Sequence, residues 1–367
     1  MKNNLLLGLM PLALSAYVCA QTAHLKLEVV NTVAEPIIGK KTLGAEKIPG
    51  GFEGGNSVKV VVNGKAQYHF FSHSYPGLGW HRSQLDHWVS DDGRQFRHAG
   101  VLQEDFEDKA AGERHIFTAP VPFYVEQENR WYLSYGEFVG KLGSNWTPGT
   151  GRMWCAPSSL SGLAGINGPF EFAKRYEFVP TQFLNKRPVS NGNPFQVKDG
   201  RWAVMICPDG PVSKTSGHWP ILLGFAPFAF GPYQSPAEHL VAPMIHPTGY
   251  SENPMVVKVK GPKSGRDYWV AVFDFLAPEG GIYKPYNVFG FTWSDDGLNW
   301  PSEHGQAVNV DDGLPAGQQG WWRGQDAVRT PHQMLDEGDG TYTIFFTGKG
   351  DQGFRPMGKA TVRLVEE

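Results

Sequence analysis

At five points along this chain, a short turn leads into an aromatic-rich strand. The turns contain related phrases, which are Asn56-Ser57-Val58, Ala119-Pro120-Val121-Pro122-Phe123, Asn193-Pro194-Phe195, Glu252-Asn253-Pro254-Met255 and Thr330-Pro331-His332-Gln333-Met334. Each phrase is followed by a polar turn and an apolar strand, and these strands span residues 68–71, 131–135, 202–206, 268–273 and 342–346. Repetition of strands at a period of roughly 50 to 70 residues is typical of a β-propeller with one sheet per repeat. We therefore expect an all-β, five-bladed β-propeller whose innermost strands begin around one central pocket.

The size and composition agree with one closed, strand-built domain. The chain has 367 residues, of which 41% are hydrophobic, and its 45 glycines and 28 prolines suit short strands and frequent turns better than long helices. The repeats span approximately residues 48–105, 114–176, 180–240, 249–310 and 321–364, and no linker divides them. Apolar and polar residues alternate in residues 25–30 and 360–364, which predicts two half-buried strands. Pairing of these terminal strands in one blade would close the ring.

The amino terminus resembles a secretory signal peptide. Lys2 precedes an apolar run over residues 5–18, and the sequence Val18-Cys19-Ala20 fits a small-residue cleavage site before Gln21. We expect cleavage near Ala20, a propeller over residues 21–367, and a secreted or periplasmic protein. Lipidation of Cys19 is the alternative. No later segment is long and apolar enough to span a membrane.

Charge and cysteine content narrow the possible partners. The net charge of -3 shows no basic stripe for nucleic acid. Cys155 and Cys207 are expected either to form one disulfide or to remain two buried thiols. The sequence contains no paired-cysteine or His-Glu-x-x-His metal motif, and we expect no cofactor, with a calcium or sodium ion in the central channel as an open alternative. The oligomeric state is left open.

Two Asp-Gly phrases mark outer hairpins. Residues 88–96 and 293–300 each place Asp-Asp-Gly between strands, with an aromatic residue three positions after the glycine. Glycine tolerates the positive φ of such turns, and aspartate hydrogen-bonds turn amides. We interpret these aspartates as structural.

The order of the phrases resembles that of the five-bladed β-propeller glycoside hydrolases, which include glycoside hydrolase families 43, 32, 62 and 117. Their blades commonly begin with Asp-Pro, Ala-Pro-Asp, Asp-Pro, Glu-Gly-Pro and Gly-His. The corresponding phrases here are Asn56-Ser57, Ala119-Pro120-Val121-Pro122, Asn193-Pro194, Glu252-Asn253-Pro254 and Pro331-His332. Gly231-Pro232-Tyr233, followed by Asn253-Pro254, resembles the third-to-fourth blade passage of families 43 and 117. The resemblance covers nearly all of the chain after the expected signal peptide.

The resemblance implies catalysis by carboxylates. Such hydrolases use a general base from the first blade and a general acid from a later blade, often with a third carboxylate that tunes the acid. In this chain the first of these positions is occupied by Asn56 or Gly55, the second by Val121 and the third by Asn193, and Glu252 stands where the resemblance places an acid. An amide cannot take up a proton at neutral pH, so we predict that nearby Glu53 is the base. Their separation would decide between inversion and retention at the sugar carbon.

Two further residues are catalytic candidates. His332 aligns with the asparagines and is expected on the pocket wall, either transferring a proton or held by structural hydrogen bonds. Asp326 would supply a carboxylate if its loop folds over the pocket. An ion pair with Arg323 or Arg329 is the alternative.

The remaining candidates are predicted to bind the sugar, because carbohydrate sites combine aromatic platforms with amide, basic and acidic groups. They are Asn56, Arg82, His115, Asn193, Asn253, Trp80, Trp322 and Arg329. The basic groups Arg82, His115, Arg329 and His332 would suit a uronic acid or sulfated sugar.

The sequence thus predicts a secreted glycoside hydrolase that acts on plant or algal polysaccharide fragments. One alternative is a polysaccharide lyase, in which Tyr250, His115 or His332 removes a proton next to a uronate. Another is a noncatalytic glycan-binding propeller, because asparagines occupy positions where relatives carry acids.

Overall fold

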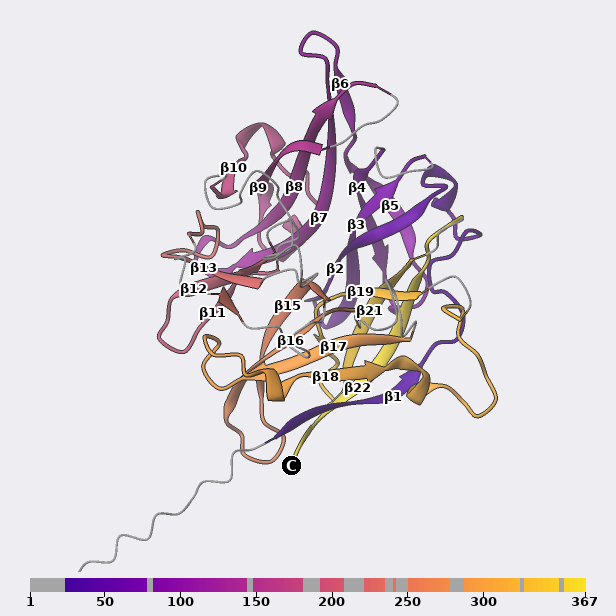
Figure 1. Cartoon of the computed structure of the whole chain (residues 1–367), viewed down its shortest axis with the longest axis vertical. Coiled ribbons are helices and arrows are strands. Elements are labelled where there is room, and N and C mark those ends of the chain that lie inside the picture. Colours follow the sequence, from indigo (N-terminus) through magenta and orange to yellow (C-terminus); the bar gives the residue numbers. More distant parts are fainter. Residues whose placement is uncertain are drawn as a thin grey trace, which may run out of the picture.

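The computed structural model describes residues 24–77, 82–143, 148–180, 192–207, 221–234, 240–241, 250–276, 287–323, 327–349 and 353–367. These residues form five antiparallel sheets arranged as a five-bladed β-propeller (Figure 1). Helical structure in them is limited to short 3-10 turns, which are η1 (Ala45–Lys47), η2 (Glu126–Glu128), η3 (Leu163–Asn167), η4 (Phe172–Lys174), η7 (Ser302–His304) and η8 (Val310–Gly313). The predicted fold class is confirmed. No helix within the described ranges is long and apolar enough to cross a membrane.

Each blade is a sheet of strands that follow one another in the sequence, with one exception at the ends of the chain. Blade I contains β2 (Gly51–Val62), β3 (Lys65–Tyr75), β4 (Gln84–Ser90) and β5 (Arg97–Gln103). Blade II contains β6 (Phe106–Asp108), β7 (Glu113–Val125), β8 (Arg130–Lys141), β9 (Pro148–Ser161) and β10 (Tyr176–Val179). Blade III contains β11 (Phe195–Gln196), β12 (Trp202–Ile206), β13 (Ile221–Ala226) and β14 (Leu240–Val241). Blade IV contains β15 (Tyr250–Lys260), β16 (Asp267–Leu276), β17 (Val288–Ser294) and β18 (Gln306–Asn309).

Blade V is built from both ends of the chain. It contains β19 (Ala327–Pro331), β20 (Leu335–Asp336), β21 (Tyr342–Lys349), β22 (Met357–Glu366) and the N-terminal strand β1 (Leu25–Thr32). Strand β1 pairs antiparallel with β22 from Leu25 opposite Glu366 to Thr32 opposite Ala360. Figure 1 shows β1 beside β22 near the C-terminus. The predicted ring closure is confirmed, and it gives β22 a partner on its outer edge.

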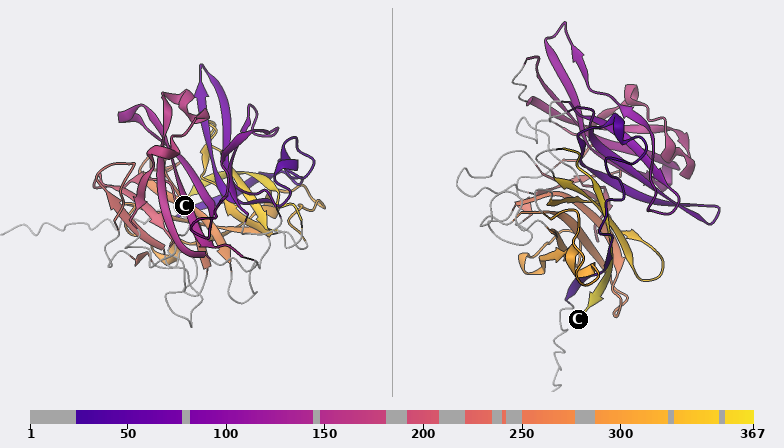
Figure 2. Two further views of the ribbon diagram at one scale, coloured as in Figure 1. Left: turned by 90° about the horizontal axis from the view of Figure 1, so that it is seen from above. Right: turned by 90° about the vertical axis from the view of Figure 1, so that its right-hand side faces the viewer.

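The predicted aromatic strands are the second strands of the five blades. They correspond to β3, β8, β12, β16 and β21, which pair directly with the inner strands or segments that carry the five phrases. Aromatic and β-branched side chains suit this position because both faces of each blade pack against neighbouring blades. Figure 2 shows the blades from two further directions, with blades I and II on one side of the molecule and blades IV and V on the other.

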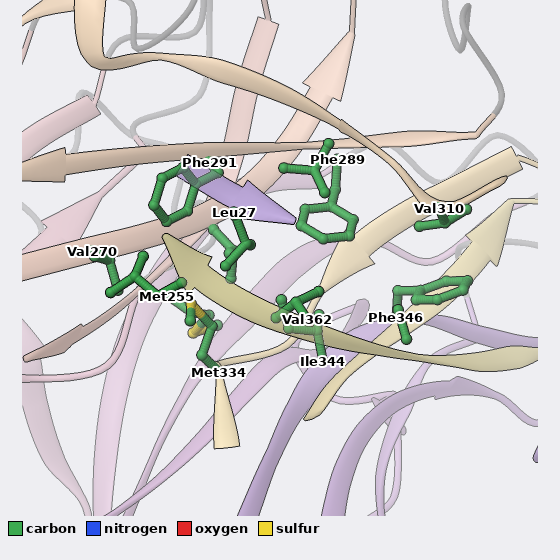
Figure 3. Close-up of a cluster of buried hydrophobic side chains, with 14 of the residues drawn as sticks. Leu27, Met255, Val270, Phe289, Phe291, Val310, Met334, Ile344, Phe346 and Val362 are labelled. Carbon is green, nitrogen blue, oxygen red and sulfur yellow. The ribbon is translucent and has the colours of Figure 1, made fainter. Parts of the chain in front are cut away.

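The hydrophobic core is divided among the blade contacts. One cluster joins blades IV and V, and Figure 3 shows Leu27 of β1 among Val270, Phe291, Ile344 and Val362. Four further clusters join blades III and IV, II and III, I and V, and I and II. Each blade is therefore stabilised mainly by the apolar area that it buries against its neighbours.

The two cysteines belong to different blade contacts. Cys155 is buried between blades II and III, and Cys207 is buried between blades III and IV. They are two separate thiols and not a disulfide. Of the two sequence expectations, the buried thiols are confirmed.

The Asp-Gly phrases form the expected outer hairpins. Asp92 accepts hydrogen bonds from the backbone amides of residues 94 and 95, and Asp296 accepts them from residues 298 and 299. Gly93 and Gly297 have φ of 64° and 78°, which glycine adopts without a Cβ clash. The structural interpretation of both aspartates is confirmed.

The central channel has two distinct ends. The inner strands of blades I and IV begin near Glu53 and Glu252, and they end near Val61 and Lys260. A cavity of about 700 Å³ lies at the second end, lined by the last residues of these strands together with residues of blades II, III and V. The charged residues described next lie at the first end.

Candidate active site

The inner strands of blades I, IV and V are each interrupted close to their starts. Pairing with the second strand shifts register between Phe52 and Gly54 in β2, between Glu252 and Met255 in β15, and between Val328 and Pro331 in β19. A β-bulge interrupts the alternation of side chains between the two faces of a sheet, and it changes the direction in which the side chains of the extra residues point. The bulged segments contain Glu53, Asn253, Arg329 and Thr330, so the bulges bring polar side chains of blades I, IV and V together.

Arg329 connects the carboxylates of this cluster. Its Nη1 contacts Glu53 Oε1, its Nη2 lies 3.6 Å from Glu252 Oε2, and its Nε lies 3.5 Å from Asp274 Oδ2. The side chains of Arg329, Glu53 and Glu252 are 13–14% exposed, whereas that of Asp274 is only 1% exposed. One guanidinium therefore joins carboxylates from blades I and IV, two of which retain some contact with solvent.

Glu53 is held by three donors. Besides Arg329, its carboxylate accepts hydrogen bonds from Arg355 and, at 2.6 Å, from the Tyr75 hydroxyl. Burial alone would raise the pKa of Glu53, but the charges of Arg329 and Arg355 outweigh burial and lower the pKa to about 2. Glu53 is therefore ionised at neutral pH.

The pKa of Asp274 is raised, whereas that of Glu53 is lowered. Asn253 Nδ2 donates to its Oδ2 at 3.1 Å and Thr330 Oγ1 donates at 3.3 Å, while Oδ1 is buried without a hydrogen-bond partner among the described residues. Burial raises the pKa of Asp274 to about 8, with the nearby Glu252 carboxylate adding to the rise and Arg329 opposing it. Sequence reasoning did not select Asp274. The sequence signal that could have identified Asp274 is its position as an isolated acidic residue in the otherwise apolar strand of residues 268–276.

The second strand of blade I supplies two more buried polar groups. His73 and Tyr75 lie two residues apart on β3 and share one face of the strand. Burial lowers the pKa of His73 to about 4, and it raises the pKa of the Tyr75 hydroxyl well above its usual value. Both side chains are therefore neutral near pH 7, and the Tyr75 hydroxyl donates a hydrogen bond to Glu53.

Arg355 reaches the cluster through a backbone contact with blade I. The Phe52 amide donates to the Arg355 carbonyl at 3.0 Å, and the Arg355 amide donates to the Gly50 carbonyl at 3.2 Å. Gly51 lies between them with φ of 72°, and a Cβ at this position would come within 2.3 Å of the Arg355 backbone. Arg355 also lies over the Tyr75 ring, 4.7 Å from its centroid. Arg355 lies outside the five phrases, so the sequence did not indicate that it belongs to the site.

The predicted pocket residues Asn56, Asn193 and His332 connect adjacent blades, and Asn193 also lines the cavity at the other end of the channel. Asn56 Oδ1 accepts from the Gln333 amide across blades I and V, and Asn193 makes two hydrogen bonds with the backbone of Val256 across blades III and IV. His332 is fully buried, with Nδ1 2.7 Å from Ser57 Oγ and its ring stacked on Phe70. The expectation that His332 lies on an open pocket wall is therefore wrong. Burial also lowers its pKa to about 3, so the imidazole is neutral.

Asn253 is the predicted asparagine that faces the cluster. It has φ of 52°, a left-handed conformation that asparagine tolerates better than most residues, and its Nδ2 donates to Asp274. Its predicted contact with sugar stays a prediction, and its observed role is to hold a carboxylate.

The other predicted basic groups are paired with acids outside this cluster. Arg82 Nε donates to Asp105 at 2.6 Å, and His115 Nδ1 lies 2.9 Å from Glu137 Oε1. Both residues belong to loops and strands of blades I and II that lie at the same end of the propeller as the starts of the inner strands. Their predicted role in binding substrate stays a prediction.

Trp322 is part of the hydrophobic core. It is fully buried in the contact of blades IV and V, and its Nε1 donates to Asp311 at 2.8 Å. The predicted sugar platform at this residue is therefore not available, because stacking requires an exposed ring face. Trp80 and Asp326 lie outside the described residues.

Metal ligands are not grouped in the described ranges. No three His, Cys, Asp or Glu side chains within them are arranged to hold a metal ion. The carboxylates of the cluster have arginines as their cationic neighbours.

Comparison with known proteins shows similarity of this chain to solved structures but not to curated sequences. No protein-family model matches the chain, and no curated protein matches its sequence. Among solved structures, a glycoside hydrolase shares 12% identity over 86% of this chain and 92% of its own, with a TM-score of 0.54. The fold is that of the five-bladed β-propeller glycoside hydrolases. An exo-inulinase from Aspergillus awamori shares 12% identity over 90% of this chain and 68% of its own, with a TM-score of 0.52.

The same fold occurs in a protein of unknown function from Dyadobacter fermentans. It shares 11% identity over 92% of this chain and 99% of its own, with a TM-score of 0.51. At these identities the similarity confirms the resemblance in fold, and the reaction has to be argued from the residues of the site.

Proposed function

We propose that this protein hydrolyses a glycosidic bond with Glu252 as general acid and Glu53 as its ionised partner. The observation that carries the proposal is the convergence of these two carboxylates, from blades IV and I, on the single guanidinium of Arg329. Paired carboxylates on either side of the scissile bond are the usual catalytic groups of glycosidases. The shared fold supports the reaction class.

The environments of the carboxylates support different roles. Glu252 lies opposite Asp274 in the β15–β16 ladder, and burial raises the pKa of Asp274 to about 8. This side of the site therefore holds a protonated carboxyl group at neutral pH. Glu53 remains ionised beside two arginines. Environments that drive apart the pKa values of neighbouring acids typically separate a proton donor from an ionised carboxylate.

The proposed reaction is balanced by one water molecule. Glu252 gives a proton to the glycosidic oxygen, which leaves as an alcohol, and the sugar carbon gains the hydroxyl of water. The charge of Glu53 stabilises the positive charge that develops at that carbon. Glu53 either removes the second proton of water directly or forms a transient ester that water cleaves, depending on its distance from the sugar.

A neutral sugar fits the described charges better than an anionic one. Arg329 and Arg355 are balanced by Glu53 and Glu252, Arg82 is balanced by Asp105, and His332 is neutral. These four basic side chains therefore do not present an excess of positive charge that would attract a uronate. We propose a neutral glycan of plant or algal origin as substrate, reached by a protein exported through the expected signal peptide.

The test is a panel of neutral and anionic oligosaccharides incubated with purified protein, with products resolved by mass. Turnover of a neutral member that Glu252→Gln reduces at least a hundredfold would support the proposal. Proton NMR of the first product would then show whether the anomeric configuration is inverted or retained. Products that absorb in the ultraviolet would indicate the lyase alternative. Binding that Glu252→Gln leaves intact, without turnover by either protein, would indicate a glycan-binding propeller.

A further inference from the structure

Another cavity lies between the outer strands of blade I and the segment that joins β9 to β10 in blade II. Its volume is about 460 Å³, within the range of about 300–1,000 Å³ that is typical of small-ligand sites. It is lined by His87 of β4, residues 99–102 of β5, and Asn167, Pro169, Phe170 and Phe172 of blade II. None of these residues belongs to the candidate active site or to the cavity at the far end of the channel.

His87 brings a polar atom to the wall of this cavity. The residue is 3% exposed, its ring is stacked on Phe71 with centroids 4.4 Å apart, and its Nε2 lies 3.0 Å from Nδ1 of His69. No described residue hydrogen-bonds Nδ1 of His87, and this atom is not sealed from solvent, in contrast to Nε2 of His69. Because polar atoms of buried side chains generally have a partner, we expect Nδ1 to bind a polar group that enters the cavity.

Gly100 keeps the space beside His87 open. The two residues are directly opposed in the ladder of β4 and β5, and opposed side chains lie on the same face of a sheet. A Cβ added at Gly100 would have no atom within 4 Å, and the backbone there does not have the positive φ that favours glycine. The backbone would therefore accept a side chain at this position, and the absence of one leaves room for a ligand.

The wall from blade II is apolar and held in place. Pro169 is exposed and Phe172 is half-buried, so each offers an apolar face. The Ser159 amide donates to the Pro169 carbonyl at 2.9 Å, and the Glu171 amide donates to the Pro157 carbonyl at 2.8 Å. These hydrogen bonds tie the segment to β9. A fixed aromatic face suits the apolar C–H face of a sugar ring.

The described lining of the cavity is uncharged. It contains no Asp, Glu, Lys or Arg, and burial lowers the pKa of His87 to about 3, so the imidazole is neutral at pH 7. In a neutral imidazole one nitrogen donates and the other accepts, and a hydroxyl group can pair with Nδ1 in either case. A carboxylate can only accept and an ammonium group can only donate. The lining therefore favours a neutral, hydroxylated ligand.

We infer that this cavity is a second carbohydrate-binding site, which holds one ring of a neutral sugar with a hydroxyl group on Nδ1 of His87 and its apolar face on Phe172. Asn167, whose Nδ2 donates to the Ala164 carbonyl at 3.4 Å, offers its amide to a second hydroxyl group. The inference shares the class of ligand with the proposed function but none of its catalytic residues. Binding here requires no turnover and would keep a glycan attached to the protein.

The test titrates methyl glycosides of glucose, galactose, xylose and arabinose into protein labelled with ¹⁵N at histidine. NMR of the imidazole nitrogens follows binding, and the His87 signal is identified by its loss in His87→Phe. At least one glycoside is expected to shift this signal to saturation, with a dissociation constant of about 1–10 mM. The absence of a saturable shift with all four glycosides would overturn the inference. A larger shift with sodium glucuronate or with phenol would overturn the assignment to a neutral sugar.

Substitutions at Gly100 test the position of the site. Gly100→Leu fills the space beside His87 and is expected to weaken binding at least tenfold. Gly100→Ala is the matched control, because it adds a single carbon and should bind within about threefold of the wild type. Both variants are expected to melt within about 2 °C of the wild type, since the new Cβ meets no atom. Equal binding by Gly100→Leu and the wild type would contradict the inference.

The same variants separate this inference from the proposed function. If Glu252→Gln abolishes turnover but Gly100→Leu leaves the shift of the His87 signal unchanged, the proposed function stands and the second site is wrong. If Gly100→Leu removes the shift in a protein that turns over no member of the oligosaccharide panel, the second site stands and the proposed function is wrong.

Discussion

At the scale of the single residue, Glu53 determines the charge balance of the site. It was selected from the sequence as a carboxylate in a glycine-rich segment, and the structure shows it between Arg329 and Arg355 with Tyr75 as a third donor. The sequence could not indicate these partners, because they lie on β3, on β19 and before β22. Contacts between residues that are hundreds of positions apart depend on how the blades close.

Glu53→Gln is expected to destabilise the protein by about 3–5 kcal/mol at pH 7, because it removes the carboxylate that two largely buried guanidinium groups share. Denaturant unfolding measures this loss. The matched control is Glu367→Gln, which breaks an exposed pair with Lys26 and is expected to cost less than about 1 kcal/mol. Equal losses in the two variants would contradict the assigned environment of Glu53.

The stabilisation from Glu53 should depend on pH. The pKa of Glu53 is lowered on folding, so its contribution is complete above the unfolded value of about 4.5 and is lost as the pH falls toward 2. The difference in unfolding free energy between the wild type and Glu53→Gln should therefore shrink over this range. A difference that stays constant down to pH 2.5 would argue against the ionised pair.

Asp274 should show the opposite dependence. Its pKa is raised on folding, so the folded state holds a proton that the unfolded state releases, and stability declines as the pH rises from about 4 to about 8. Asp274→Asn removes this titration, and its melting temperature should change less than that of the wild type over the same range. Parallel melting curves for the two proteins would show that Asp274 ionises normally in the fold.

At the scale of the element, β-bulges in the inner strands β2, β15 and β19 bring the polar side chains of the site together. The phrases Glu252-Asn253-Pro254 and Arg329-Thr330-Pro331 coincide with register shifts, and proline fits such positions because it has no amide hydrogen to donate to the ladder. The sequence therefore marked the right segments. It misassigned the side chains of Asn56 and His332, since one residue of register decides whether a side chain faces the site or a neighbouring blade.

Gly51 at the start of β2 is a test of this placement. Gly51→Ala is expected to destabilise the protein by about 2–4 kcal/mol and to reduce activity, because the new Cβ would displace the backbone of Arg355. Gly64→Ala serves as the control, since Gly64 has a similar positive φ of 76° but no atom within 4 Å of the added Cβ. Its expected cost is about 1–2 kcal/mol from strain alone. Similar losses of stability and activity in both variants would show that contact with Arg355 is unimportant.

At the scale of the whole molecule, stability depends on closing the ring. Strand β1 supplies Leu25 and Leu27 to the contact of blades IV and V, and it covers the edge of β22. Removal of residues 1–32 is expected to lower the melting temperature by more than 10 °C and to promote aggregation through the exposed edge. Removal of residues 1–20 alone, the expected signal peptide, should leave the melting temperature unchanged. Calorimetry and light scattering measure both effects, and a stable monomer without β1 would refute the requirement for closure.

The sequence by itself determined the repeat, the strand type and the number of blades, because these follow from local alternation, turn residues and spacing. It also pointed to Glu53, Glu252, Asn253 and Arg329. Only the tertiary structure decided that Arg329 joins the carboxylates, that Asp274 and Arg355 complete the cluster, and that Trp322 and His332 are buried. The physical reason is that pairing between blades fixes which side chains share a low-dielectric space, and a local pattern contains no information about that distance.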